Sequence, residues 1–385
     1  MPNYKEPLLV SHLHARGRQL GLPIAGTFEL TPRCNFHCKM CYVHLSREEQ
    51  ERRGKELTAE QWLQIAREAK DAGMVFLLLT GGEPLLRPDF PEIYRQLKAM
   101  GFIITINSNG YLIRDDLRKL FIENPPVRIN ISLYGTSDAT YDKMCGVPAH
   151  ERITENIRAL REAGIDVKIN MSLTPDNQED MESVFRTAQS LGVHTQSSPY
   201  MFPPIRIHPE SIGQNKRMPA EEAGEFMTRY NALCMDHDSF CRTAYTMEQG
   251  LQVELPDEDT CQGTPGSGIT CRAGITSFWL TWDGKMMPCG QMVEPVADTL
   301  QLGFDEAWRQ IRQAAAKIRL PGECVTCQYR NVCHVCAAMC YCETGRFDGK
   351  PEYICKMNQT FADTTVSYWK DKLHGELPQK KEDTK

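Results

Sequence analysis

Apolar runs alternate with amphipathic segments along residues 25–199 of the chain. Segments such as "MVFLLLTGGEP" and "IDVKINMSL" are apolar on both faces, whereas "PDFPEIYRQLKAMG" and "AHERITENIRALREAG" carry apolar residues at helical spacing. Strands that are apolar on both faces and separated by helices indicate a parallel sheet with crossover helices. Six such units predict an α/β fold, a partial (β/α)6 TIM-like barrel, with functional loops at the carboxyl ends of the strands. The predicted strands are "AGTFEL", "MVFLLLT", "FIITINS", "VRINISLYG", "IDVKINMSL" and "VHTQSSPY".

The segment between the first two strands contains a clear helix signal. Thr58 precedes apolar positions at helical spacing and can cap the helix, and Gly73 ends it. This pattern predicts that a helix begins after Thr58 and leads back to the second strand.

The alternation stops after Pro199. A proline-rich connection, "MFPPIRIHPESIGQ", leads to one helix in "PAEEAGEFMTRYNALCMDH", and from Cys261 the chain is rich in glycine and cysteine. "SFWLTWDGKMMPCG" reads as a hairpin with Asp283-Gly284 in the turn. The predicted organisation is an N-terminal extension (1–23), a barrel (24–235), a linker (236–260), a small cysteine-rich domain (261–365) and a polar tail (366–385).

Composition excludes several functional classes. With 44 Lys and Arg against 50 Asp and Glu, the formal net charge is −6, so no basic footprint for nucleic acid or an anionic membrane is expected. The sequence has no apolar run of the ~18 residues that a membrane span requires. The first 30 residues lack the apolar core of a signal peptide. We therefore expect a cytoplasmic protein that binds neither nucleic acid nor membrane.

The number of cysteines is higher than expected for an ordinary cytoplasmic protein. The chain has 16 cysteines, and ten of them lie between Cys261 and Cys355. Dense cysteines at short spacings in a reducing compartment are typical of metal or iron–sulfur ligation rather than of disulfides. We therefore predict that this region binds metal.

A second group of cysteines follows the first predicted strand. Cys34, Cys38 and Cys41 are separated by three and two residues. A structural zinc site requires four protein ligands, and a four-iron cluster requires one ligand for each iron. Three thiolates on one loop therefore leave one iron open to a substrate or cofactor, provided that no distant fourth ligand closes the site.

This loop resembles the CxxxCxxC signature of the radical S-adenosylmethionine (radical SAM) enzymes. The resemblance implies that Cys34, Cys38 and Cys41 bind a [4Fe-4S] cluster whose open iron chelates SAM, and that cluster reduction cleaves SAM to a 5′-deoxyadenosyl radical. "TGGEP" stands at the end of the second strand, where the family's second motif occurs. By resemblance, Gly81, Gly82, Glu83 and Pro84 receive the amino group of SAM.

The next two strand ends extend the resemblance, which covers about residues 24–200. Ser108 in "NSNG" and Asn130 and Ser132 in "NISLYG" match positions that contact the ribose and carboxylate of SAM in the family. The chain departs from the family beside the third cysteine, where an aromatic residue often stands. Here that residue is Met40, and Tyr42 follows the cysteine instead, so we take Tyr42 as the candidate adenine contact.

The C-terminal cysteines resemble the SPASM extension of many radical SAM enzymes, which binds two auxiliary [4Fe-4S] clusters. By position, Cys261, Cys271 and Cys289 hold the first auxiliary cluster, with Cys336 as fourth ligand and Cys340 as its rival. The second auxiliary cluster is assigned to Cys324, Cys327, Cys333 and Cys355. Cys342 is then spare, and Cys145, Cys234 and Cys241 are expected to be buried structural thiols. A pair of zinc sites is the alternative, since CxxC pairs suit zinc equally well.

The resemblance implies an enzyme that modifies a ribosomally synthesised peptide by hydrogen abstraction, forming a thioether or related cross-link. The expected partners are the peptide substrate, a separate leader-recognition protein if one is needed, and a flavodoxin- or ferredoxin-type reductant. About 24 residues precede the barrel, too few for the leader-binding domain of many such enzymes. Gly290 follows Cys289, where sulfatase-maturing enzymes have aspartate. The alternatives are modification of a small molecule or tetrapyrrole, and a non-catalytic iron–sulfur electron carrier.

Overall fold

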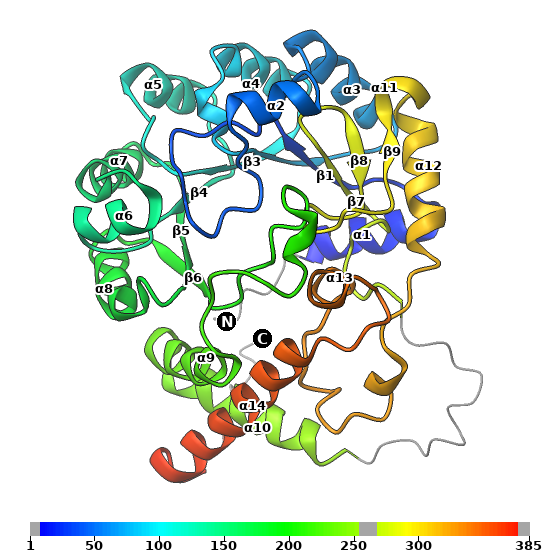
Figure 1. Cartoon of the computed structure of the whole chain (residues 1–385). Coiled ribbons are helices and arrows are strands. Elements are labelled where there is room, and N and C mark those ends of the chain that lie inside the picture. The colour runs from blue at the N-terminus through cyan, green and yellow to red at the C-terminus, as the bar shows by residue number, and fades with distance from the viewer. Residues whose placement is uncertain (1–7, 254–267, 376–385) are drawn as a thin grey trace, which may run out of the picture.

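The centre of the molecule is a curved sheet of nine strands, seen in the middle of Figure 1. The computed structural model describes residues 8–253 and 268–375. The order of the strands in the sheet is β6-β5-β4-β3-β2-β1-β7-β8-β9. The strands are β1 (Ala25–Glu29), β2 (Phe76–Thr80), β3 (Ile103–Ser108), β4 (Arg128–Ser132), β5 (Val167–Ser172), β6 (His194–Ser198), β7 (Ser277–Leu280), β8 (Lys285–Met287) and β9 (Ala297–Asp298).

Strands β1 to β6 run parallel to one another, as predicted. One face of each strand from β1 to β5 is apolar and packs against helices; Phe28, for example, is fully buried with its ring 5.0 Å from that of Trp62. The other face lines the barrel interior, and on β3 to β5 that face carries polar side chains such as Asn107, Asn130 and Lys168. The fold therefore combines an apolar outer layer with a polar interior, and the predicted partial barrel is confirmed.

Helices surround the sheet on its outer side (Figure 1). Thr58 caps the helix over Ala59–Asp71 as predicted. Its side chain accepts a hydrogen bond from the Gln61 N–H, and its own N–H donates to the Gln61 side chain. The helices are α1 (Leu8–Leu20), α2 (Arg47–Arg53), α3 (Ala59–Asp71), α4 (Phe90–Ala99), α5 (Asp115–Glu123), α6 (Asp138–Cys145), α7 (His150–Glu162), α8 (Met181–Ser190), α9 (Ala220–Cys234), α10 (His237–Leu251), α11 (Thr299–Leu302), α12 (Phe304–Ala315), α13 (Ala337–Thr344) and α14 (Glu352–Lys372). Short 3-10 turns are η1 (Pro84–Leu86), η2 (Gln178–Asp180), η3 (Pro209–Ser211) and η5 (Gly322–Cys324).

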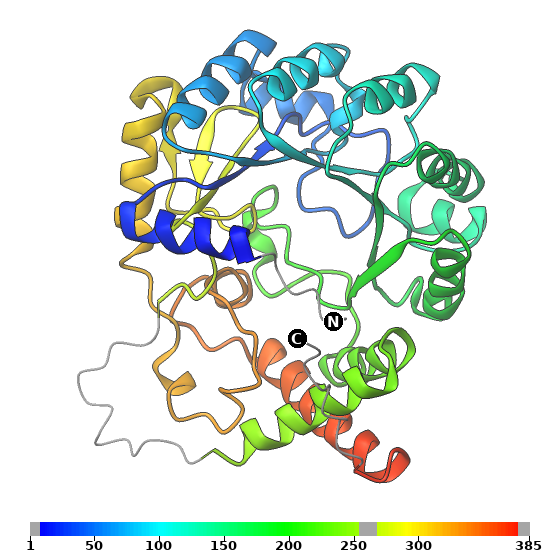
Figure 2. The same cartoon turned by 180° about the vertical axis from the view of Figure 1, so that it is seen from behind.

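The C-terminal region continues the barrel sheet. Strand β7 pairs in parallel with β1, and β7, β8 and β9 then form antiparallel pairs, with Asp283-Gly284 in the predicted hairpin turn. Figure 2 shows α1 beside α12 at this end of the sheet, where the Trp308 Nε1–H donates to the Gly21 carbonyl over 2.8 Å. The cysteine-rich region predicted as a separate domain thus shares its backbone ladder with the first strand of the barrel.

Two segments that the sequence assigned to a linker and to a polar tail contain helix in the structure. Residues 237–251 of the predicted linker (236–260) form α10, which is capped by Asp236 and buries Phe240, Ala244 and Met247. The predicted tail (366–385) begins too early, since residues 366–372 complete α14 and Trp369 is only 3% exposed. Both segments alternate charged and apolar residues, so their polarity concealed helices that bury one face only.

The segment between β6 and α9, residues 199–219, crosses the middle of the molecule in Figure 1 and is called the strap. Its Arg206 forms a two-bond ion pair with Glu29 on β1, at 2.8 and 2.9 Å, and also donates to the Gly290 carbonyl. At its end, Arg217 pairs with Glu343 of α13. Arg53 of α2 donates to the carbonyls of Arg206 and Ile207. The strap thus connects the barrel interior to the C-terminal region.

In the part of the chain that the structure describes, no helix is long and apolar enough to cross a membrane.

We expect Trp369→Ala to lower the free energy of unfolding by about 3–5 kcal/mol, the usual cost of removing a buried Trp side chain. Trp369 packs with Phe240, Cys241 and Ala244, so the substitution would leave a cavity between α14 and α10. Urea unfolding followed by circular dichroism measures the change. Asp371→Ala in the same helix turn is the matched control, and equal stability of the two variants would contradict the placement of Trp369.

Candidate functional site

The loop that carries Cys34, Cys38 and Cys41 leaves the carboxyl end of β1 and lies against the end of α6. The His37 N–H donates to the Cys145 carbonyl over 2.9 Å, and the Lys39 N–H donates to the Met144 carbonyl over 3.1 Å. The three thiols are half-buried. The sequence between the cysteines therefore takes its shape from α6, which lies more than a hundred residues later in the chain.

The three thiols of this loop lie close together. Burial raises the pKa of Cys34 above its ordinary value, and the neighbouring Glu83, Cys38 and Cys41 raise it further. Backbone N–H groups of Phe36 and His44 point at the sulfurs of Cys34 and Cys41, at 3.4 and 3.3 Å. Mutually close thiols that receive N–H donors fit the ligands of one iron–sulfur cluster.

Cys145, predicted to be an ordinary buried cysteine, contacts this set of thiols. It is fully buried, and its hydrogen bond with Cys38 is the largest cause of the raised pKa of Cys38. Its place beside Cys38 comes from the contact between the loop and α6, which sequence spacing alone does not reveal.

The backbone at Gly81 and Gly82 passes so close to the start of the cysteine loop that neither position has room for a side chain. A Cβ on Gly82 would stand 2.4 Å from the Arg33 carbonyl oxygen, and one on Gly81 would stand 2.5 Å from that of Thr31. The Gly82 and Glu83 N–H groups donate to these same two carbonyls, over 2.7 and 2.9 Å. The absence of side chains at Gly81 and Gly82 thus permits a close backbone approach that fixes the loop before Cys34.

Glu83 is fully buried and holds the end of β3 in place. Its carboxylate accepts from the Ser108 hydroxyl at 3.0 and 3.1 Å and from the Asn109 N–H at 2.7 Å, while the adjacent Pro84 opens η1 and the Leu85 N–H also donates to it. Burial raises the pKa of Glu83 to about 7, against these donors. Glu83 and Ser108, both predicted to contact SAM, therefore contact each other.

Asn109 is a site residue that the sequence analysis missed. Its side-chain N–H₂ group lies 3.7 Å from the Cys34 sulfur and donates to the Asn35 side chain over 2.9 Å. Asn109 thus links the third strand end directly to the cysteine loop. The sequence signal for Asn109 is its place in "NSNG", directly after Ser108 at the end of the strand.

The barrel interior offers acceptors that have no partner. Asn130 donates to Asn107 on β3 over 2.8 Å, but the side-chain oxygen of Asn130 is buried without a hydrogen bond, as is that of Asn170 on β5. Ser132 on β4 is half-buried and hydrogen-bonds the Tyr134 side chain. A buried acceptor without a partner is costly, so these amides fit a ligand that brings N–H or O–H donors, as SAM does.

Tyr42 lies in the barrel interior near the ion pair of Glu29 and Arg206. Burial raises its pKa above the ordinary value, and Glu29 raises it further, whereas Arg206 opposes the change. Cys289 of the C-terminal region also contributes to this shift. Tyr42, at the end of the cysteine loop, is therefore an electrostatic neighbour of both Cys41 and Cys289.

The C-terminal thiols that the structure describes form two groups. In the first, Cys271 and Cys336 add to the effect of burial in raising the pKa of Cys289 to about 11. Cys261, assigned to the same cluster, lies outside the described residues. Cys342, which the cysteine spacing leaves without a predicted ligand role, is buried within electrostatic reach of Cys289 and Cys336, and its thiol donates to the Gln291 carbonyl over 3.2 Å.

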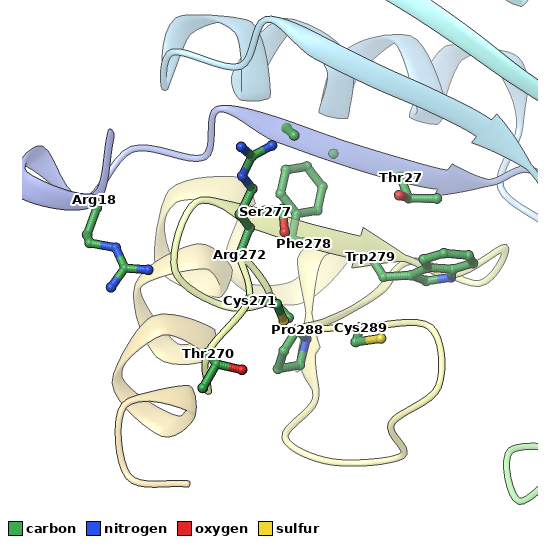
Figure 3. A pocket seen from close by; sticks show the side chains of 13 residues that line it. Arg18, Thr27, Thr270, Cys271, Arg272, Ser277, Phe278, Trp279, Pro288 and Cys289 are labelled. Atoms are coloured by element: carbon green, nitrogen blue, oxygen red, sulfur yellow. The ribbon is translucent and has the colours of Figure 1, made fainter. Parts of the chain in front are cut away.

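The first group of thiols opens onto a cavity of about 620 Å³ beside β1 and β7, shown in Figure 3. Cys271 and Cys289 line it together with Trp279 of β7 and Arg18 of α1. Its volume lies within the ~300–1,000 Å³ of small-molecule and cofactor pockets. The helix before the barrel thus contributes a cationic side chain to the same cavity as two predicted cluster ligands.

The second group consists of Cys324, Cys327, Cys333 and Cys355. Burial raises the pKa of Cys355 to about 11, with Cys333 and Cys324 as the next causes. Burial likewise raises the pKa of Cys333, and Cys327 raises it further. Cys340 is fully buried, and its electrostatic neighbours belong to both groups, namely Cys324, Cys336, Cys355 and Cys333.

Within residues 8–253 and 268–375, no three His, Cys, Asp or Glu side chains converge closely enough to hold a single metal ion. A tetrahedral zinc site places its thiolates within about 4 Å of one another. In a four-iron cluster each thiolate binds its own iron, so the thiols stand farther apart.

Comparison with known proteins identifies relatives of several kinds. Residues 28–188 match the protein family described as the Radical SAM superfamily. The chain is 30% identical over 278 residues to a probable GTP 3′,8-cyclase of Saccharolobus solfataricus, covering 71% of this chain and 84% of that protein. It is 26% identical over 330 residues to the AdoMet-dependent heme synthase of Methanosarcina barkeri, covering 83% and 93%.

The fold extends to a solved structure of low sequence identity. Streptococcus suis SuiB bound to the precursor peptide SuiA superposes with a TM-score of 0.61 at 18% identity. The match covers 92% of this chain and 83% of SuiB. The shared fold therefore includes the C-terminal region as well as the barrel.

We expect Gly82→Ala to displace the cysteine loop, because the added methyl group would meet a backbone carbonyl that cannot move independently. The variant should retain fewer irons per chain after anaerobic reconstitution and should unfold at a lower temperature. Gly322→Ala is the control, since a Cβ there meets nothing within 4 Å. Iron content equal to that of wild type in Gly82→Ala would show that this close approach does not position the loop.

Proposed function

The chain belongs to the radical SAM superfamily, and from that premise we propose that it modifies a ribosomally synthesised peptide by hydrogen abstraction, forming a thioether or related cross-link. The observation that carries the proposal is that the chain combines one three-cysteine loop after β1 with two further groups of thiols in the C-terminal region. The first set leaves an iron free for SAM, and the others suit two auxiliary [4Fe-4S] clusters.

The chemistry of the bound groups can be stated briefly. When bound at Cys34, Cys38 and Cys41, the catalytic cluster would supply the electron for reductive cleavage of SAM, and an auxiliary cluster would take up the electron left over when substrate C–H and S–H bonds are replaced by C–S. In this balance one hydrogen atom from carbon would leave as part of 5′-deoxyadenosine, and the thiol hydrogen would leave as a proton. A flavodoxin- or ferredoxin-type protein is the proposed reductant.

The residues of this chain hold and orient the reactants. Cys34, Cys38 and Cys41 are the proposed ligands of the catalytic cluster. The buried bonds among Glu83, Ser108 and Asn109 fix the strand ends around that cluster. The free oxygens of Asn130 and Asn170 are proposed to accept hydrogen bonds from SAM. The strap covers the barrel interior and restricts the access of water. A carbon radical requires such exclusion of water.

The C-terminal ligand sets are proposed in the same way. Cys336 fits the fourth position of the first auxiliary cluster because Cys271 and Cys289 are its electrostatic neighbours. Cys340 lies between the two groups and is the weaker candidate. Cys324, Cys327, Cys333 and Cys355 remain the proposed ligands of the second auxiliary cluster.

The peptide substrate is supported by the fold shared with SuiB, whose structure was solved with a precursor peptide. A small-molecule or tetrapyrrole substrate is the second candidate. It is favoured by the relatives of higher sequence identity, a probable GTP 3′,8-cyclase and an AdoMet-dependent heme synthase. The two candidates share the radical chemistry and differ only in what the barrel admits.

We expect the combined variant Cys34→Ala/Cys38→Ala/Cys41→Ala to bind about eight irons per chain where wild type binds about twelve, because one of three four-iron clusters is lost. Formation of 5′-deoxyadenosine from SAM under dithionite should fall to background. Iron, sulfide and zinc per chain and the nucleoside product are measured after anaerobic reconstitution. Cys234→Ala, a half-buried cysteine outside the three groups, is the control.

The outcomes of this experiment test the catalytic cluster and the two auxiliary clusters separately. Iron content unchanged by the triple substitution would refute the catalytic cluster. About four irons falling to none, with zinc making up the remainder, would retain the radical enzyme and refute the two auxiliary clusters.

Substrate class is tested by supplying the reconstituted enzyme with short cysteine-containing peptides, with GTP, or with a carboxylated porphyrin. We expect a peptide that loses the mass of two hydrogen atoms while 5′-deoxyadenosine accumulates. Conversion of GTP or of the porphyrin, with every peptide unchanged, would refute peptide modification and support the second candidate.

A further inference from the structure

Three lysine side chains converge on one carboxylate at the rim of the barrel. The ammonium groups of Lys143 and Lys39 lie 3.2 and 3.7 Å from the Asp176 carboxylate oxygens, and Lys216 forms a third, close contact. Lys39 lies in the cysteine loop, Lys143 in α6, Asp176 after β5 and Lys216 in the strap. Four segments that are far apart in sequence thus supply what we call the lysine site.

The lysine site carries excess positive charge. Three ammonium groups face one carboxylate, and within the described residues Asp176 is the only carboxylate with which these lysines form an ion pair. The hydrogen bond from Lys216 lowers the pKa of Asp176, so this carboxylate carries its negative charge at neutral pH. The excess is therefore two positive charges.

The lysine site is also accessible. Asp176 is only 12% exposed, whereas the side chains of Lys39, Lys143 and Lys216 are 47%, 56% and 40% exposed. An ammonium group has three N–H donors, and its ion pair with a single carboxylate leaves donors free for another anion. The site can therefore accept a second acidic group without breaking the contacts it has.

The location relates the lysine site to the reaction. Lys39 stands between Cys38 and Cys41, and its N–H donates to the carbonyl of Met144, the residue after Lys143. Two of the three lysines are thus fixed against each other by the same contact that shapes the cysteine loop. All four residues follow carboxyl ends of barrel strands, which is the rim where parallel barrels bind their substrates.

We propose that Lys39, Lys143 and Lys216 bind carboxylate groups of an acidic segment of the peptide substrate at the entrance to the barrel. The inference rests on the proposed peptide function, because a peptide supplies the carboxylates. Attraction between this excess charge and an acidic segment would bring the peptide to the rim next to Cys34, Cys38 and Cys41. It adds a recognition element on the barrel itself to any separate leader-binding protein.

The test measures binding by fluorescence anisotropy of fluorescein-labelled hexaglutamate on the reconstituted enzyme without reductant. We expect Lys143→Gln/Lys216→Gln to bind about five- to thirtyfold more weakly than wild type, the loss of two partly exposed ion pairs. Labelled hexaglutamine should bind wild type poorly. Binding of hexaglutamate should weaken as salt is raised, because exposed charges are screened.

The matched control removes the same charge elsewhere. Lys119 and Lys356 are exposed lysines with single ion-pair partners, Glu123 and Glu221. Lys119→Gln/Lys356→Gln should keep hexaglutamate affinity within about twofold of wild type, since both charges lie in other segments. Equal weakening in the two double variants would attribute the effect to net charge and overturn the proposal.

A further variant distinguishes a ligand site from a structural brace. Asp176→Asn raises the excess charge from two to three and should tighten hexaglutamate binding by about two- to fivefold. Weaker or unchanged binding would show that the lysines serve only to hold Asp176. Tripolyphosphate is the competitor: if it binds through the lysines and hexaglutamate does not, the peptide assignment is overturned.

Failure of this inference and failure of the proposed function give different results. The binding measurement needs no turnover, so it stands even if no peptide is ever modified. Absence of 5′-deoxyadenosine from reduced wild-type enzyme would refute the proposed function while leaving the affinities of the variants to be compared.

Discussion

The buried ion pair between Glu29 and Arg206 joins the parts of the molecule that the site requires. Glu29 is fully buried at the end of β1, just before the cysteine loop, and it also accepts from the Trp279 Nε1–H of β7 over 2.9 Å. Arg206 reaches it from the strap and donates as well to the carbonyl after Cys289. An ion pair that is buried is costly to break by removing one partner, because the other charge is left without compensation. The cysteine loop, the strap and the first group of C-terminal thiols are thereby held in one arrangement.

The chemistry at the strand ends depends on packing of backbone against backbone. The glycine pair after β2 lies against the carbonyls that precede Cys34, and Glu83 then gathers the N–H groups at the end of β3. The same short motif therefore supports the loop and presents a buried carboxylate. A residue that contacts a ligand in one enzyme can also serve as the support for its neighbours, and in this chain Glu83 has that second role.

The strands and their order along the chain could be predicted from sequence, because continuous apolar runs and period-two patterns are local signals. The grouping of the cysteines along the chain is local too, because it depends on short spacings. Contacts between distant segments could not. Asn109 and Cys145 reach the cysteine loop only because β3 and α6 end beside it, and Trp369 looked like part of a polar tail because one face of α14 is charged. The pairing of β7 with β1 likewise depends on which edge of the barrel sheet was available, and no local pattern records that.

That pairing has a consequence for how the molecule matures. The strand that leads into the cysteine loop has β2 on one side and, on the other, a strand that begins some 250 residues later in the chain. While a ribosome is still making the middle of the protein, β1 exposes an unpaired edge, and Glu29 has neither Arg206 nor Trp279. The surroundings of the first three cysteines are therefore complete only once residues 277–280 have been synthesised and have paired with β1, so we expect the proposed cluster to assemble late in the folding of the chain.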